Sequence, residues 1–256
     1  MPLELVTIPC LSDNYAYLVH DDKSGETAVF DVPEGGPILE TLEARGWRLS
    51  HVFLTHHHPD HVQGTADLLA KAPARVIGAA ADAHRLPSLD QQVGQGDVVP
   101  LGGESVEVIE VPGHTTGHVA YHLPTSAILV TMDSLMHLGC GRLFEGTAAQ
   151  MFDSLGRMAV LPPETIVCSG HEYAETNVRF ALTIEPENSR LISRRDEIAA
   201  ARAAGRATVP TTLALELDTN PFLRCHIPAV QASVGLADGD PLAVFAEVRK
   251  RRDSFS

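Results

Sequence analysis

The stretch VFLTHHHPDH, at positions 52–61, constrains the fold of this chain more than any other. Its apolar start predicts a buried β-strand, so the histidines fall on the turn that leaves that strand. Pro59 disfavours a helical backbone at His58, and we therefore expect a helix to begin at about Asp60 and to continue to Lys71. The sequence thus predicts a strand, a histidine-rich turn and a helix in direct succession.

The histidines and the aspartate of this turn have the spacing of metal ligands. His56 and His58 are two residues apart, so their side chains leave an extended backbone on the same side and suit one ion. Asp60 and His61 lie beyond the turn and are available to a second ion. Imidazole and carboxylate ligands without a thiolate favour zinc, manganese or iron.

Three further apolar segments lead into a residue that can bind a metal. These predicted strands cover residues 105–111, 126–131 and 165–168. They are followed by His114, Asp133 and His171. Because ligands at strand ends along one edge of a sheet can converge on a single cleft, we expect these groups to share a site with the histidine turn.

The composition excludes several classes of protein. A net charge of -14 argues against general nucleic-acid binding, which needs clustered lysine and arginine. No segment is apolar for long enough to span a membrane, and the start of the chain, Met1 to Cys10, lacks the basic region of a signal peptide. A cytoplasmic location is therefore expected.

The four cysteines show no paired C-x-x-C spacing, and no export signal accompanies them. We therefore expect buried, unpaired thiols rather than a disulfide framework. The cysteines are Cys10, Cys140, Cys168 and Cys225.

The composition and hydrophobic pattern of the sequence change near Tyr173. Before it, short apolar runs such as 27–32 predict strands, and 36–45 predicts an amphipathic helix between them. After it, the segment 187–204 is rich in alanine, arginine and glutamate and predicts a helix that ends at Gly205. A last helix is expected from Asp240, as N-cap, with Pro241 in its first turn, to about Arg252.

These motifs resemble those of the metallo-β-lactamase superfamily. The turn has the pattern H-x-H-x-D-H, and Gly113 to His118 has the pattern G-H-T-x-G-H. Further segments are similar to those of the hydroxyacylglutathione hydrolases, or glyoxalase II, within that superfamily. They cover residues 9–15, 139–147, 171–173 and 220–224.

The resemblance implies an α/β fold, in which an αββα sandwich is followed by a smaller helical C-terminal domain. It implies a catalytic domain at residues 1–173 and a substrate-binding helical domain at residues 174–256. The implied enzyme cleaves the thioester S-(2-hydroxyacyl)glutathione, such as S-D-lactoylglutathione, to glutathione and a 2-hydroxy acid, the second step of methylglyoxal detoxification. It implies two divalent metal ions per chain, with zinc expected and iron or manganese as alternatives.

The resemblance also divides the ligands between the two ions. One ion is assigned to His56, His58 and His114. The other is assigned to Asp60, His61 and His171, and Asp133 bridges both. Asp60 and Asp133 are the expected catalytic residues, with Asp60 as a candidate acceptor for the proton of the attacking water.

Other polar residues of the motifs are not expected to bind a metal. His57 occupies a variable position. His118, Thr115 and Thr116 are expected to support the ligands.

The glutathione contacts of the family fall on Arg142, Tyr173, Arg249 and Arg252, where cationic side chains meet the two carboxylates of glutathione. Positions 142 and 252 are often lysine in relatives, so Arg142 and Arg252 keep the charge. Phe144 stands where relatives often have tyrosine, and the missing hydroxyl predicts somewhat weaker binding. For Tyr173, a packed loop aromatic is the alternative.

Three other functions are compatible with parts of the pattern. A lactonase, β-lactamase or other esterase on the same scaffold is disfavoured by the glutathione-contact positions. A nuclease is disfavoured by the net charge of -14. A metal-binding or redox protein without hydrolytic activity is disfavoured because every ligand position is filled. We expect a monomer that acts on a small molecule and binds neither nucleic acid nor membrane.

Overall fold

The computed structural model, which describes residues 2–255, has two six-stranded β-sheets, and the apolar runs of the first part of the chain form most of their strands. In the first sheet the strands follow chain order, and pairing is parallel from β3 to β6. Parallel pairing brings the carboxyl ends of these strands to one edge of the sheet. The strands are β1 (Glu4–Cys10), β2 (Asn14–Asp21), β3 (Glu26–Phe30), β4 (Arg48–Leu54), β5 (Arg75–Ala79) and β6 (Gln91–Val93).

The second sheet has the order β14-β13-β10-β9-β8-β7. Because β9 is antiparallel to both β8 and β10, and β10 is parallel to β13, the strands β8, β10 and β13 end at the same edge. The strands are β7 (Val98–Leu101), β8 (Glu104–Glu110), β9 (Val119–Leu123), β10 (Ile128–Met132), β13 (Ile166–Ser169) and β14 (Thr211–Thr212). A small hairpin, β11 (Leu135–Met136) and β12 (Gly139–Cys140), follows β10.

The two sheets pack face to face over an apolar core. Aromatic rings from both sheets meet there, since Phe53 lies 5.0 Å from both Phe30 and Tyr121 between ring centroids. A second core lies between the outer face of the first sheet and the helices, where Leu18 and Val52 pack with Ile38. A third core covers the outer face of the second sheet. The predicted αββα sandwich is confirmed.

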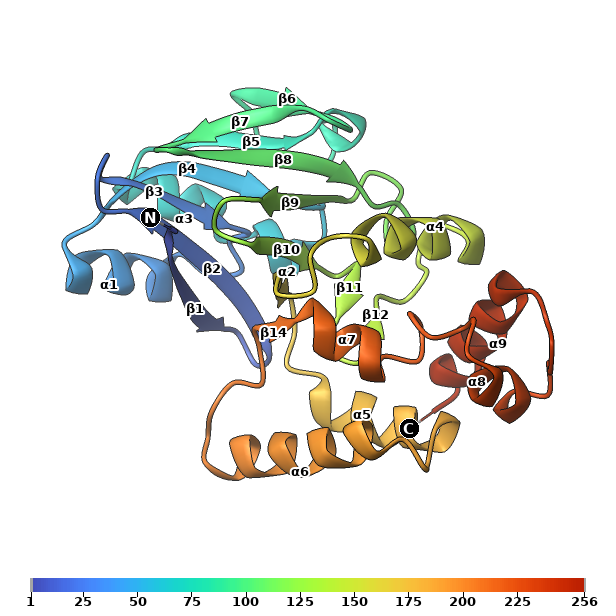
Figure 1. The fold of residues 1–256 in the computed structure, drawn as a ribbon. Coiled ribbons are helices and arrows are strands. Elements are labelled where there is room, and N and C mark those ends of the chain that lie inside the picture. The colour runs from blue at the N-terminus through green and yellow to red at the C-terminus, as the bar shows by residue number, and fades with distance from the viewer. Residues whose placement is uncertain (1, 256) are drawn as a thin grey trace.

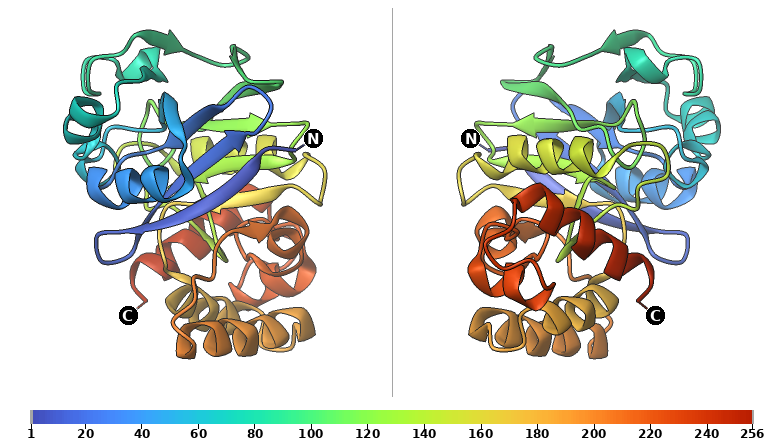
Figure 2. Two further views of the ribbon diagram at one scale, coloured as in Figure 1. Left: turned by 90° about the vertical axis from the view of Figure 1, so that its left-hand side faces the viewer. Right: turned by 90° about the vertical axis from the view of Figure 1, so that its right-hand side faces the viewer.

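Helices cover the outer faces and then form a group of their own at one end of the sandwich (Figure 1). Both side views show the helices of the C-terminal part, drawn in orange to red, gathered at the lower end of the sandwich (Figure 2). The helices are α1 (Gly35–Arg45), α2 (Pro59–Val62), α3 (Thr65–Lys71), the 3-10 turn η1 (Ala80–Asp82), α4 (Ala148–Ala159), α5 (Ala174–Ile184), α6 (Ser189–Ala203), α7 (Leu213–Thr219), α8 (Pro228–Ser233) and α9 (Pro241–Asp253).

The prediction of one helix from Asp60 to Lys71 is wrong. The helix breaks after α2, and α3 begins with Gly64 as its N-cap. The Gly64 N–H donates to the carbonyl of Val32 (2.9 Å) instead of continuing the helix. A Cβ at Gly64 would stand 2.7 Å from the Gly35 nitrogen, so the break lets the start of α1 approach closely.

The C-terminal helix predictions are confirmed with small shifts in their ends. Asn188 caps α6 through its side chain, and Gly205 follows the helix with φ of 66°. Asp240 caps α9 by accepting the Ala243 N–H, as predicted. The C-terminal part also returns to the sandwich, because β14 pairs with β13.

Candidate active site

The histidine turn leaves the buried strand β4 and is held by Asp31, which follows the neighbouring strand β3. The Thr55 N–H donates to Asp31 Oδ1 (2.8 Å) and the Thr55 hydroxyl to Oδ2 (2.7 Å). His58 keeps an extended backbone before Pro59, as predicted, and α2 begins at Pro59. These contacts place the side chains of the turn at the shared edge of the two sheets.

Three predicted ligands lie close enough to hold one metal ion and form the first candidate metal-binding group: His56, His58 and His114. One nitrogen from each ring lies within 4.8 Å of the others, and His114 Nε2 is 3.0 Å from His58 Nδ1. The His114 Nδ1–H donates to the Arg142 carbonyl (2.8 Å), which leaves the Nε2 lone pair free for an ion. Burial, and then His114, lower the pKa of His58 to about 4, so this ring is neutral at pH 7, as a ligand must be.

A second group contains Asp60, His61 and His171. His61 Nδ1 bonds Asp31 Oδ2 (2.8 Å) and His171 Nδ1 bonds Asp13 Oδ1 (2.9 Å). Both Nε2 lone pairs therefore face the site, where these atoms are 3.3 Å apart.

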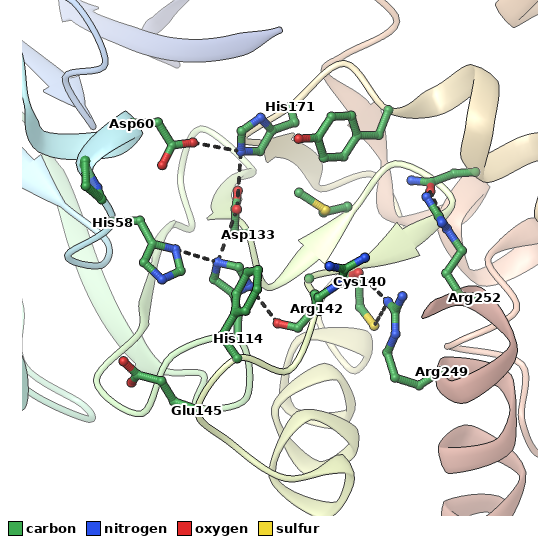
Figure 3. Close-up of a pocket in the computed structure, with 16 residues that line it drawn as sticks. His58, Asp60, His114, Asp133, Cys140, Arg142, Glu145, His171, Arg249 and Arg252 are labelled. Carbon is green, nitrogen blue, oxygen red and sulfur yellow. Dashed lines mark hydrogen bonds and ion pairs between the residues drawn. The ribbon is translucent and has the colours of Figure 1, made fainter. Parts of the chain in front are cut away.

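Asp133 lies between the two groups, at the end of β10 (Figure 3). Its Oδ2 is 3.3 Å from Nε2 of both His114 and His171, and its Oδ1 is 3.4 Å from His61 Nε2. The Asp133 carboxylate is therefore within reach of rings from both groups.

The donor set fits two divalent cations. Nitrogen ligands at the usual 2.0–2.1 Å from a tetrahedral zinc ion stand about 3.4 Å apart, close to the contacts between these rings. His56 Nε2 and Asp133 Oδ1 are buried polar atoms without a hydrogen-bond partner in residues 2–255. Such orphaned acceptors are costly unless a cation satisfies them.

A cavity of about 840 Å³ opens from this cluster. It reaches from the metal-binding side chains to α9 and the hairpin β11-β12 (Figure 3). All five predicted substrate contacts line it: Arg142, Phe144, Tyr173, Arg249 and Arg252. A volume of this order is typical of small-molecule sites.

Two of the three arginines of α9, Arg249 and Arg252, point into this pocket. Arg249 is buried and donates to the Cys140 carbonyl (3.0 Å) and to Asp253 (2.7 Å). Arg252 is half-buried and donates from two nitrogens to Asn177 Oδ1 (3.2 and 3.1 Å). These hydrogen bonds hold both guanidinium groups in place.

The aromatic contacts lie over the metal-binding rings. Tyr173 stacks on His171 with ring centroids 4.8 Å apart, and its pKa is raised to about 12, mainly by burial, so the phenol stays protonated. Phe144 meets His58 and His114 edge-on, although its side chain is 62% exposed. Arg142 lies 5.9 Å from the Phe144 ring.

The remaining motif residues lie around the ligands. His118 stacks on His56 at 4.6 Å, as a supporting residue would. His57 turns away from the cluster and lies 3.1 Å from Asp82.

All four cysteines are buried and free, as predicted. Cys140 lines the pocket, and its pKa is raised to about 11 by burial. A thiol with this pKa is a weak nucleophile at neutral pH.

Sequence reasoning missed three supporting residues: Asp13, Asn14 and Asp31. Asn14 donates to Asp60 Oδ2 (3.0 Å) and so orients that carboxylate. Asp31 follows an apolar strand in the same way as Asp133 does, and this signal could have found it. Asp13 lies in the turn that follows β1, and its role is recognisable only from the contact with His171.

Comparison with known proteins agrees with this geometry. Residues 12–171 match the family model described as metallo-beta-lactamase superfamily, and residues 172–255 match hydroxyacylglutathione hydrolase C-terminus. A hydroxyacylglutathione hydrolase from Cereibacter sphaeroides is 60% identical over 255 residues, covering 100% of both chains. The chain belongs to the hydroxyacylglutathione hydrolase family. A second hydroxyacylglutathione hydrolase, from Ruegeria pomeroyi, is 58% identical over 100% of both chains.

Solved structures share the fold of this hydroxyacylglutathione hydrolase family member. The B3 metallo-beta-lactamase BLEG-1 superposes with a TM-score of 0.67 at 21% identity, covering 86% of this chain and 99% of that one. The protein TTHA1623, in a di-iron-bound form, superposes with a TM-score of 0.62 at 26% identity, covering 86% and 100%. Family membership makes this chain a hydrolase that uses divalent metal ions. No helix in residues 2–255 combines the length and hydrophobicity needed to cross a bilayer.

Proposed function

We propose that this hydrolase cleaves the thioester bond of S-(2-hydroxyacyl)glutathione, such as S-D-lactoylglutathione, releasing glutathione and a 2-hydroxy acid. The observation that carries the proposal is one cavity with a metal-binding cluster at one end and the guanidinium groups of α9 at the other. Such a cavity suits a substrate with a reactive carbonyl at one end and carboxylates at the other. The names of the relatives support the same substrate class. This reaction is the second step of methylglyoxal detoxification.

The proposed ligand sets are those implied by the resemblance. His56, His58 and His114 would hold one ion, Asp60, His61 and His171 would hold the other, and Asp133 would contribute its carboxylate to both. When bound, the two ions supply Lewis acidity and lower the pKa of water from 15.7 toward about 7. Zinc is the proposed metal, and the same donor set accepts iron or manganese.

The protein side chains orient the reaction. Asp60, held by Asn14, faces the cluster and accepts the proton of the attacking water. The leaving group is a thiolate with a free pKa near ~8.5, so it departs without a strong general acid. This accounts for a site that uses neither a serine or cysteine nucleophile nor a separate acid.

The other end of the cavity binds glutathione. Arg142, Arg249 and Arg252 give charge-assisted hydrogen bonds to its carboxylates. Tyr173 contributes a protonated phenol beside His171. Phe144 supplies an apolar wall without a hydroxyl.

The proposal includes the domain division at residues 1–173 and 174–256. The second part is substrate-binding because it contributes α9 to the cavity. A monomer in the cytoplasm is also proposed, and the free state of all four cysteines agrees with a reducing compartment.

A substrate screen on purified protein tests this function. S-D-lactoylglutathione, a short lactoyl thioester without glutathione, a lactone and a β-lactam are assayed beside elemental analysis of the bound metal. We expect lactoylglutathione to have the highest kcat/KM. A higher kcat/KM for the lactone or the β-lactam would overturn the proposal.

A further inference from the structure

The middle histidine of the turn belongs to a polar cluster outside the metal site. His57 lies between two carboxylates, with Nδ1 3.1 Å from Asp82 and Nε2 3.5 Å from Glu145. Asp82 ends the short turn η1 after β5, and Glu145 belongs to the pocket wall after β12. The cluster therefore connects segments that are far apart in the sequence.

Arg85 joins the two carboxylates from the other side. Its Nη2 bonds Asp82 Oδ1 (2.5 Å) and Glu145 Oε2 (3.1 Å), while Nη1 bonds Glu145 Oε1 (2.5 Å). Glu145 Oε2 also accepts the N–H and the hydroxyl of Thr116 (2.8 and 3.0 Å). We call His57, Asp82, Arg85, Thr116 and Glu145 the Arg85 network.

The side chains of the Arg85 network are less exposed than those of an ion pair on an open surface. The Asp82 side chain is 2% exposed, and those of Arg85 and Glu145 are 27% and 25% exposed. Hydrogen bonding to Arg85 lowers the pKa of Glu145 to about 2, so this carboxylate is charged at neutral pH. Networks with bidentate geometry resist solvent screening better than isolated pairs.

The network fixes one end of the segment from Arg142 to Glu145. The other end is fixed by the metal-binding group, because the Arg142 carbonyl accepts the His114 Nδ1–H. Phe144 stands between these two points with its side chain 62% exposed, so burial alone does not hold it. Figure 3 shows Glu145 on the side of the pocket away from Arg249 and Arg252.

The backbone beyond this segment has its own anchor. Gly146 N–H donates to the Gly113 carbonyl (3.1 Å), and the two backbones approach closely. Loss of the Arg85 network should therefore loosen the tip from Arg142 to Glu145 without unfolding the loop.

From these contacts we propose that Arg85 and Glu145 are positioning residues that hold Arg142 and Phe144 against the metal-binding turn and thereby set the affinity for the glutathione part of the substrate. Among the hydrogen bonds and ion pairs of residues 2–255, Arg85 has none with a residue assigned to the substrate, so it acts through Glu145. The substrate part of this inference rests on the proposed function.

The kinetic test compares the variants Arg85→Met, Glu145→Gln and the double variant. The control is Arg157→Met, which removes another carboxylate-bound arginine on the exposed face of α4. We expect Arg85→Met to raise KM for lactoylglutathione about five- to tenfold, with kcat and metal content within about twofold of the unchanged protein. The double variant should equal the larger single effect, because the two residues act as one unit. A short thioester without glutathione should show no change with Arg85→Met.

A second measurement separates this inference from the proposed function. Amide hydrogen exchange over residues 139–147 should become faster in Arg85→Met and stay unchanged in Arg157→Met. Unchanged exchange in Arg85→Met, or an equal loss of activity on both thioesters with loss of metal, would overturn the positioning role. Inactivity of the unaltered protein on lactoylglutathione would overturn the proposed function alone, since the exchange result still decides whether the network holds the segment.

Discussion

Three of the five candidate metal-binding rings are oriented by the contact of their second nitrogen. His61 bonds Asp31, His171 bonds Asp13, and His114 bonds a backbone carbonyl. These contacts select the tautomer that turns a lone pair toward the cluster. The supporting carboxylates are consequently as necessary to the geometry as the ligands themselves.

Of the four basic residues of α9, Arg249 and Arg252 face the pocket, whereas Lys250 and Arg251 do not. Lys250 has a side chain that is 79% exposed, and Arg251 donates to the carbonyls of Ser233 and Val234. Truncating Arg249 would leave the buried Cys140 carbonyl without its donor, which costs stability as well as binding. Arg252 is therefore the cleaner position for a binding test.

We expect Arg252→Ala to raise KM for lactoylglutathione about tenfold and to leave kcat nearly unchanged, because the contact is far from the reacting carbonyl. Lys250→Ala is the matched control and should leave both constants unchanged. Steady-state kinetics measure the effect. An equal rise of KM for a short thioester without glutathione would indicate a damaged pocket instead of a lost glutathione contact.

At the scale of the elements, the break between α2 and α3 shows that a tertiary contact can interrupt a helix that the local sequence pattern predicts. The apolar periodicity continues across residues 60–71, yet the Gly64 N–H is taken by the Val32 carbonyl. The same glycine provides the space in which the first residues of α1 meet α3. A short α2 leaves Asp60 and His61 close to the histidine turn.

The variant Gly64→Ala should lower the free energy of unfolding by about 1–3 kcal/mol, since its Cβ would press on the backbone of Glu34 and Gly35. Gly156→Ala provides a control of opposite sign. Gly156 lies inside α4 with nothing within 4 Å of a new Cβ, so alanine there should stabilise by up to about 1 kcal/mol. Denaturant unfolding measures both values. Equal stability of Gly64→Ala and the unaltered protein would mean that the close approach has no energetic consequence.

For the molecule as a whole, the candidate site lies where the two sheets and the helical C-terminal part meet. The candidate ligands come from the first sheet through the histidine turn, and from the second sheet through the ends of β8, β10 and β13. The helical C-terminal part closes the cavity with α9. Ions bound there would stabilise the contact between the two sheets.

Removal of the metal should therefore lower Tm. Ions present at ~100 times their Kd contribute roughly 2.7 kcal/mol. For a chain of this size that corresponds to a fall in Tm of roughly 5–10 °C on chelation. Differential scanning calorimetry with and without a chelator measures this change in Tm, and elemental analysis follows the metal content.

The variant Asp133→Ala, which removes the proposed bridging carboxylate, should hold at least one ion fewer and should show a smaller change in Tm with the chelator. Full metal content and an unaltered Tm response in this variant would exclude Asp133 from the site.

Much of the fold followed from local pattern. Apolar runs ending in histidine or aspartate predicted β4, β8, β10 and β13, because strand formation depends on short-range alternation and burial. Capping chemistry predicted the start of α9 at Asp240. The sequence also indicated the ligand types and their positions at strand ends. Their division between two ions was implied only by the resemblance.

Other features depended on contacts between distant segments. The break at Gly64, the support of His171 by Asp13 and the Arg85 network all join residues with no shared local pattern. Their geometry exists only once the two sheets are packed and their loops meet at one edge. Local periodicity encodes which residues form strands and helices, whereas the partner of a buried polar group is selected by three-dimensional proximity and the cost of leaving that group unsatisfied.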